Sequence, residues 1–120
     1  MLRAVWNGIV LAEAPRAVRL EGNLYFPPRS LNTAYLVRSR TRTLCPWKGL
    51  ASYYDLTTEQ GTLKDVAWYY PHPSPMARRI KNHVAFYPDV TVHGEPEPRS
   101  EADRGLRASV ARFLDPSRAS

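Results

Sequence analysis

Residues 45–56 read CPWKGLASYYDL, and this stretch decides the fold class of the chain. Its second part, residues 50–56, is rich in aromatic side chains, which are enriched in β-strands. Its first part contains Pro46 and Gly49, residue types that allow a turn or a bulge. The stretch therefore predicts a β-strand that begins directly after a chain reversal.

Short apolar or alternating runs, each bounded by turn residues, recur on both sides of this stretch. Asn7-Gly8 predicts a two-residue hairpin between residues 4–6 and 9–11, because both residues tolerate positive φ. Gly22-Asn23 predicts a second turn, and Gln60-Gly61 a third. Further strands are expected at residues 17–21, 24–26, 36–43, 67–70, 84–87 and 90–93. Hairpins at this spacing favour a mainly β fold, with two packed antiparallel sheets or a small open barrel.

Helices are expected only in short segments. Residues 30–35 could hold one helical turn, and Ser74-Pro75 is typical of a helix start, with Asn82 as a left-handed stop. Residues 106–114 carry one apolar stripe at helical spacing after a capping box at residues 100–103. We therefore predict a single β-rich domain over residues 1–93. Residues 94–120 are expected to form a linker and a C-terminal amphipathic helix that packs on the domain or on a partner.

Composition narrows the class of protein. The 120 residues suit one domain with one core, and 11 prolines argue against long helices. A single cysteine excludes an internal disulfide, so we expect a cytoplasmic location. No apolar run approaches the roughly 20 residues of a membrane helix, so we expect no membrane contact. The net charge of +6 favours anionic ligands in general, although dispersed arginines are also typical of a solvated surface.

Cys45 and Lys48 are the candidate catalytic residues. A thiolate is the reactive form of cysteine, and a nearby cation such as Lys48 lowers a thiol pKa. Three residues is an odd spacing, so only a turn at Pro46 or Gly49 would bring the two side chains together. A buried cysteine beside a packed Trp47, a binding role and a nucleophilic role all remain open.

Aromatic side chains gather in several strands. Alternation places Tyr53 and Tyr54 on opposite faces of one strand, and it places Trp68 and Tyr70 together on one face of another. Each cluster therefore sends at least one ring into the core and at least one outward or toward a pocket. An aromatic-walled pocket and a plain core with exposed tyrosines are both consistent with this pattern.

Other chemistries find less support. His72, His83 and His93 with Cys45 match no standard zinc spacing, so we expect no metal site and no cofactor. No catalytic-triad elbow, phosphate-binding glycine loop or paired-carboxylate motif is present. Basic charge with aromatic rings is also found in single-strand nucleic-acid binders, but no RNA-binding motif accompanies it.

Several segments in serial order resemble a bacterial family, the domain of unknown function family four-two-seven, which is sometimes labelled nucleotidyltransferase-like. The resemblance covers about residues 5–92, and it lies in Trp6-Asn7-Gly8, Glu21-Gly22-Asn23, Tyr25-Phe26-Pro27-Pro28, Cys45-Pro46-Trp47-Lys48-Gly49 with Tyr53, Ala67-Trp68-Tyr69-Tyr70-Pro71 and Val84-Ala85-Phe86-Tyr87. It implies a β-tent-like fold, in which two antiparallel sheets meet at an angle. Many β-tent proteins use a four-cysteine zinc site, which one cysteine cannot supply. No Asp-x-Asp or Glu-x-Asp pair lies on an expected strand, so the resemblance implies the fold rather than an activity.

The leading hypothesis is a domain that binds a small ligand, anionic or nucleotide-like, in an aromatic-walled pocket. The expected ligand-binding residues, which match motifs of the family, are Glu21, Asn23, Tyr25, Trp47, Lys48, Tyr53 and Trp68. An enzyme that uses Cys45 and a single-stranded nucleic-acid binder are the alternatives. The sequence does not determine the oligomeric state.

Overall fold

The computed structural model of the chain describes residues 1–98, and its first hairpin reverses at Asn7 and Gly8. Their φ angles are 46° and 78°. Positive φ at both central positions gives a two-residue turn whose twist matches that of paired strands. The turn joins β1 (Leu2–Trp6) to β2 (Ile9–Ala14), which confirms the hairpin that Asn-Gly predicts.

The second turn lies one residue earlier than the sequence predicts. Leu20 of β3 (Val18–Leu20) pairs with Asn23 of β4 (Asn23–Tyr25), so the turn residues are Glu21 and Gly22. Glu21 takes a φ of 54° and Gly22 a φ of 80°, again the two positive values that such a turn requires. Asn23 is therefore a strand residue, and Glu21 stands at the tip of the hairpin.

Four strands in sequence order form the largest sheet. They are β5 (Leu36–Cys45), β6 (Gly49–Thr58), β7 (Gly61–Tyr69) and β8 (Val84–Phe86), and all neighbours are antiparallel. The β5–β6 and β6–β7 pairs each contain a register shift, near residues 38–42 and 54–56. Such bulges re-aim the side chains beside them.

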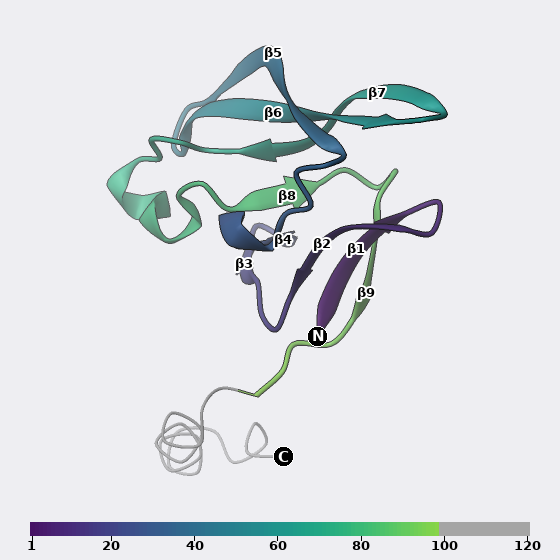
Figure 1. The fold of residues 1–120 in the computed structure, drawn as a ribbon. Helices are drawn as coiled ribbons and strands as arrows, with labels where there is room; N and C mark the ends of the chain where they lie inside the picture. Colours follow the sequence, from purple (N-terminus) through teal and green to yellow (C-terminus); the bar gives the residue numbers. More distant parts are fainter. Residues whose placement is uncertain (99–120) are drawn as a thin grey trace.

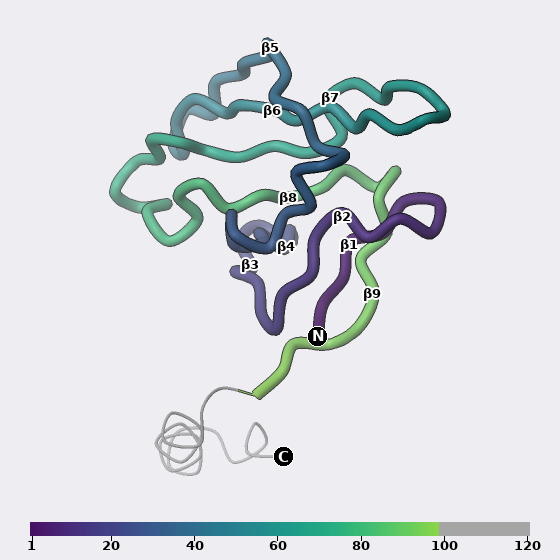
Figure 2. Tube along the Cα trace, in the orientation of Figure 1, coloured from purple at the N-terminus to yellow at the C-terminus, as the bar shows by residue number. Residues whose placement is uncertain are grey.

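The end of the domain returns to its beginning. β9 (Thr91–Gly94) pairs antiparallel with β1, so the second sheet has the order β2-β1-β9. Figure 2 shows the two segments running side by side, although they lie at opposite ends of the described chain. Beyond β9, the Glu95 carbonyl accepts a hydrogen bond from the Met1 ammonium, and the Glu97 amide donates to the Pro15 carbonyl.

The sheets pack on each other around two hydrophobic clusters (Figure 1). The larger cluster joins residues of the β2-β1-β9 sheet, such as Leu11, to residues of the four-stranded sheet, such as Leu56. The prediction of two sheets is incomplete, because β3 and β4 form a small third one. Directly after this ribbon, Phe26 forms an isolated bridge with Val84 of β8. The sheets are not closed into a barrel.

The helical segments differ from those expected. Residues 28–30 form a 3₁₀ turn, η1 (Pro28–Ser30), slightly before the predicted one. The predicted helix after Ser74 is a 3₁₀ helix, η2 (Pro75–Ile80), with a kink at Ala77. Ser74 does not cap it, because its Oγ is buried without a hydrogen-bond partner in the described part of the chain. Asn82 takes the expected left-handed φ of 60°. The predicted C-terminal helix lies outside the described residues.

Candidate functional site

The predicted chain reversal lies at residues 46–48, between β5 and β6. Gly49 follows with a φ of 116°, and a Cβ at this position would lie 3.2 Å from the His72 carbonyl oxygen. The Lys48 carbonyl accepts a hydrogen bond of 2.9 Å from the Ser74 amide. The backbone of the turn is thus clamped against the segment that leads into η2.

Lys48 and Glu21 form an ion pair between two turns that are far apart in the sequence. The Trp47 Nε1–H also donates to Glu21 Oε2 at 3.3 Å. Only 8% of Lys48 is exposed, and its Nζ lies 5.4 Å from the Trp47 ring and 5.5 Å from the Tyr70 ring. Three predicted site residues, Glu21, Trp47 and Lys48, are therefore brought into contact.

The charges of this pair stabilise each other. Burial is the largest influence on the pKa of Lys48 and would lower it, but the hydrogen bond to Glu21 and the charge interactions with Tyr25, Tyr70 and Cys45 together raise it. The same hydrogen bond lowers the pKa of Glu21. Both groups stay ionised at neutral pH, so the positive charge of Lys48 is already compensated within the domain. An anionic ligand would have to displace Glu21 to use it.

Tyr25 and Trp68 pack in the second hydrophobic cluster. Tyr25 is fully buried, and the Trp68 Nε1–H donates to its hydroxyl oxygen at 3.1 Å, with the rings edge to face at 6.3 Å. Burial raises the pKa of Tyr25, and it raises that of Tyr70, which is 5% exposed, to about 12. These rings serve mainly as core, so Tyr25 offers no open wall to a ligand.

The contacts of Cys45 and Asn23 do not indicate a catalytic or ligand-binding role for either residue. Cys45 is free, partly buried and packed against the tyrosines. Asn23 is partly buried in β4, and its side chain forms no hydrogen bond within residues 1–98. The nucleophilic role of Cys45 and the ligand-binding role of Asn23 stay predictions.

A hollow of about 400 Å³ opens on the four-stranded sheet, on the face that carries Tyr53 of the second hydrophobic cluster. It is lined by Thr41, Thr43, Tyr53, Asp65, Val66, Tyr87, Pro88 and Asp89. The Thr43 and Tyr53 hydroxyls are hydrogen-bonded at 2.7 Å. Tyr87, which is 40% exposed, packs against Trp68 with the rings tilted at 54° and their centres 4.6 Å apart. Of the predicted site residues, Tyr53 lines this hollow, and Trp68 supports its Tyr87 wall.

The register shifts explain how Asp65 reaches the hollow. Asp65 has a φ of 55°, and its amide donates to Asp55 Oδ1 at 2.8 Å. Its two carboxylate oxygens accept hydrogen bonds from the Ser39 and Thr41 hydroxyls at 2.6 and 2.8 Å. Asp89 lies exposed at the rim, and it makes no ion pair or side-chain hydrogen bond among residues 1–98.

Sequence reasoning does not identify the residues that complete this hollow. Tyr87 ends the family motif of residues 84–87, and Pro88-Asp89 marks the turn that follows. Neither signal is specific enough to identify a binding site. The positions of Thr41, Thr43 and Asp65 in the hollow depend on the two register shifts, which are known only once β5, β6 and β7 are paired. In the described part of the chain, no group of three or more His, Cys, Asp or Glu side chains could hold a metal ion.

The antiparallel sheets, the clamped turn and the tyrosine-lined hollow define a small all-β domain with a candidate binding face. A family profile described as Domain of unknown function (DUF427) matches residues 1–97, and the chain belongs to this family. A search of curated proteins finds no match. Within residues 1–98, no helix has the length and apolar character needed to span a membrane.

Proposed function

We propose that the domain binds a small ring-bearing molecule in the hollow lined by Tyr53 and Tyr87. The observation that carries the proposal is a wide-open hollow of about 400 Å³ with two tyrosines in its wall and the Asp89 carboxylate at its rim. Ligand sites are typically concave, with large apolar walls and a few polar groups that fix orientation. The volume falls within the range of roughly 300–1,000 Å³ that such sites occupy.

The polar groups of the hollow indicate the chemistry of the ligand. Asp65 and Asp89 are hydrogen-bond acceptors. The Thr41 hydroxyl gives its proton to Asp65 and can only accept, whereas one hydroxyl of the Thr43–Tyr53 pair keeps a proton to donate. An anionic ligand would meet two carboxylates here, whereas amine or hydroxyl donors would be attracted to them. We therefore expect a ring with amine or hydroxyl substituents, stacked on a tyrosine face.

A thermal-shift panel tests this function. It contains aromatic amines, aminosugars, and acidic metabolites that include nucleotides. A ligand present at about 100 times its Kd stabilises the folded state by about 2.7 kcal/mol, which is a shift of several degrees. We expect such shifts for donor-bearing rings, and a panel without any shift would contradict the proposal.

Two matched variants locate the binding. Asp89→Asn removes the free carboxylate at the rim, and Glu59→Gln removes one exposed carboxylate from the distant β6–β7 turn. We expect Asp89→Asn to reduce the shift caused by an amine ligand and Glu59→Gln to leave it unchanged. Equal shifts in both variants would place the ligand elsewhere.

The β-tent arrangement of the sheets and the cytoplasmic location of the protein are also proposals. The β-tent arrangement is supported by the angle at which the four-stranded sheet and the β2-β1-β9 sheet meet in Figure 1. A cytoplasmic location rests on the single cysteine of the chain.

A further inference from the structure

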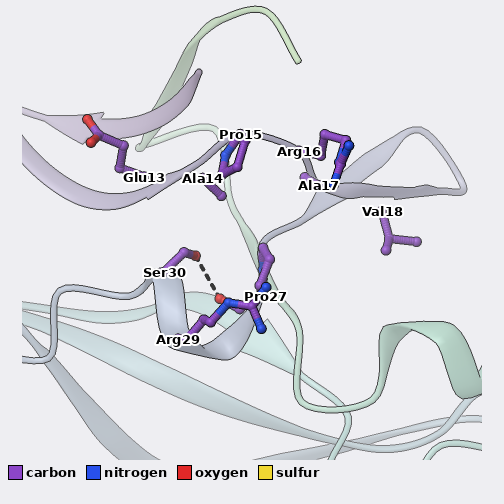
Figure 3. A pocket seen from close by; sticks show the side chains of 9 residues that line it. All are labelled: Glu13, Ala14, Pro15, Arg16, Ala17, Val18, Pro27, Arg29 and Ser30. Atoms are coloured by element: carbon purple, nitrogen blue, oxygen red, sulfur yellow. Dashed lines mark hydrogen bonds between the residues drawn. The ribbon is translucent and has the colours of Figure 1, made fainter. Parts of the chain in front are cut away.

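A second hollow, of about 440 Å³, lies away from the tyrosine-lined one. Its upper side in Figure 3 is residues 13–18, which run from the end of β2 into β3. Its lower side is Pro27 with residues 29–30 of η1. The Ser30 hydroxyl donates to the Pro27 carbonyl at 2.6 Å, which ties η1 to the chain that enters it.

Two arginines dominate the charge of this hollow. Arg16 belongs to the upper side and Arg29 to the lower side, and both are exposed. Within residues 1–98, neither guanidinium forms an ion pair or a hydrogen bond. The carboxylate that also lines the hollow, Glu13, is already paired with Arg3. The hollow therefore carries about two uncompensated positive charges.

The remaining lining is mostly apolar and rigid. It consists of Ala14, Pro15, Ala17, Val18 and Pro27, together with the polar Ser30. Proline has a fixed φ and no amide hydrogen, so Pro15 and Pro27 present hydrocarbon surface with little conformational freedom. The position of the Pro15 segment is further held by the hydrogen bond between its carbonyl and the Glu97 amide. Such walls suit the apolar body of a small molecule.

We propose that this hollow binds a small organic phosphate monoester. A guanidinium offers a fork of donors that matches phosphate oxygens, and two of them balance a group that carries about −1.5 to −2 charges at neutral pH. The apolar body of the ester lies against the proline and alanine walls. The site is independent of the proposed tyrosine-lined hollow, because the two share no residue.

Calorimetric titration with phenyl phosphate tests the proposal. We expect saturable binding of phenyl phosphate to the full chain, weaker binding of inorganic phosphate, and none of phenol. The double variant Arg16→Gln/Arg29→Gln should weaken the binding of phenyl phosphate by about tenfold or more, because it removes charge-assisted hydrogen bonds. Both side chains are exposed, so the variant should keep the melting temperature of the wild type.

Arg38→Gln/Arg40→Gln is the matched control, since it removes the same net charge from exposed positions of β5. This control should retain most of the affinity. A loss of affinity that is equal in both double variants would show attraction by net charge alone and would overturn the site. Absence of binding by the wild type at millimolar phenyl phosphate would also overturn it. Asp89→Asn should leave this titration unchanged, which separates the test from that of the tyrosine-lined hollow.

Discussion

At the scale of single residues, Lys48 is a buried ionised group held by several contacts. It is almost buried, its ammonium contacts Glu21, and two aromatic rings flank it. Glu21 is half-exposed, with 45% of its side chain open to water. The two partners therefore lose different amounts of solvation when the pair is broken.

This asymmetry predicts unequal effects of Glu21→Gln and Lys48→Met on the free energy of unfolding. Glu21→Gln leaves a buried ammonium without its counter-ion, whereas Lys48→Met leaves a carboxylate that water can solvate. We expect the larger loss for Glu21→Gln in urea denaturation at pH 7. Glu13→Gln, at the exposed pair with Arg3, should stay within about 0.5 kcal/mol of the wild type. Equal losses for the two site variants would contradict this explanation.

The same pair predicts part of the acid sensitivity. Because the pKa of Glu21 is lowered in the folded state, its contribution is present above the unfolded value of 4.5 and is lost as the pH falls through the folded value. The unfolding free energy of Glu21→Gln should therefore fall less between pH 5 and pH 3 than that of the wild type. The pKa of Asp55 is also lowered: burial would raise it, but the hydrogen bonds from Lys64 and Asp65 and the charge of Lys64 together outweigh burial. Some acid sensitivity should therefore remain.

Tyr70 predicts a complementary loss of stability in alkali. Burial raises its pKa from 10 to about 12, so the folded state holds this proton more tightly than the unfolded chain. Its contribution is full below pH 10 and is lost as the pH rises from 10 toward 12. Urea midpoints between pH 9 and pH 11.5 should decline less in Tyr70→Phe than in the wild type. Identical slopes would show that Tyr70 titrates as it does in water.

At the scale of elements, the pairing of β1 with β9 depends on a close approach of two backbones. Gly94 pairs with Leu2 at a φ of 91°, and a Cβ there would lie within 2.1 Å of the Met1 carbonyl oxygen. Gly8 has a comparable φ of 78°, but a Cβ there would meet nothing within 4 Å. The two glycines thus share a positive φ and differ in their surroundings.

Alanine at these two positions should separate strain from steric clash. Gly8→Ala carries the cost of a left-handed alanine, roughly 1–2 kcal/mol. Gly94→Ala carries the same cost and must also displace the Met1 backbone, so we expect a clearly larger loss of stability. Chemical denaturation of both variants measures the difference. If Gly94→Ala is no worse than Gly8→Ala, the β1–β9 approach is looser than the structure shows.

The elements also show what the sequence can predict. The Asn7-Gly8 turn and the faces of Tyr53, Tyr54, Trp68 and Tyr70 follow from local chemistry and period-2 alternation, and the structure confirms them. The error at Glu21-Gly22 arises because turn position depends on strand register rather than on glycine alone. Ser74 resembles a helix cap in sequence, but the helix that follows has only six residues and a kink.

At the scale of the whole molecule, the domain is assembled by contacts that no local pattern reveals. β9 pairs with a strand about 90 residues earlier, and Glu21 meets Lys48 from another hairpin. The sequence therefore predicts the mainly β class and the family, but not the third sheet or the bulges that shape the tyrosine-lined hollow. Nor does it predict that Arg16 and Arg29 share a hollow, because η1 and the β2–β3 loop meet only in the folded chain.

Truncation tests this assembly. Both hydrophobic clusters lie within residues 2–90, and the last described strand ends at Gly94. We expect the full chain and a chain of residues 1–98 both to unfold cooperatively. Residues 1–90 lack β9 and should be markedly less stable, because β1 loses one of its two neighbouring strands. Circular dichroism melts compare the three chains, and equal stability of the shortest would show that β9 is dispensable.

The bulge in β5 has a consequence for how copies of this domain behave at high concentration. β5 is the outer strand of its sheet, and a ten-residue outer strand is a template for unwanted polymerisation. Here the guanidinium of Arg42 donates hydrogen bonds to the carbonyl oxygens of Ser39 and Thr41, which are then not free to pair with another strand. Arg38 and Arg40 add positive charge that repels the β5 strand of a second copy. The β5 bulge that shapes the tyrosine-lined hollow thereby also disfavours aggregation through this edge.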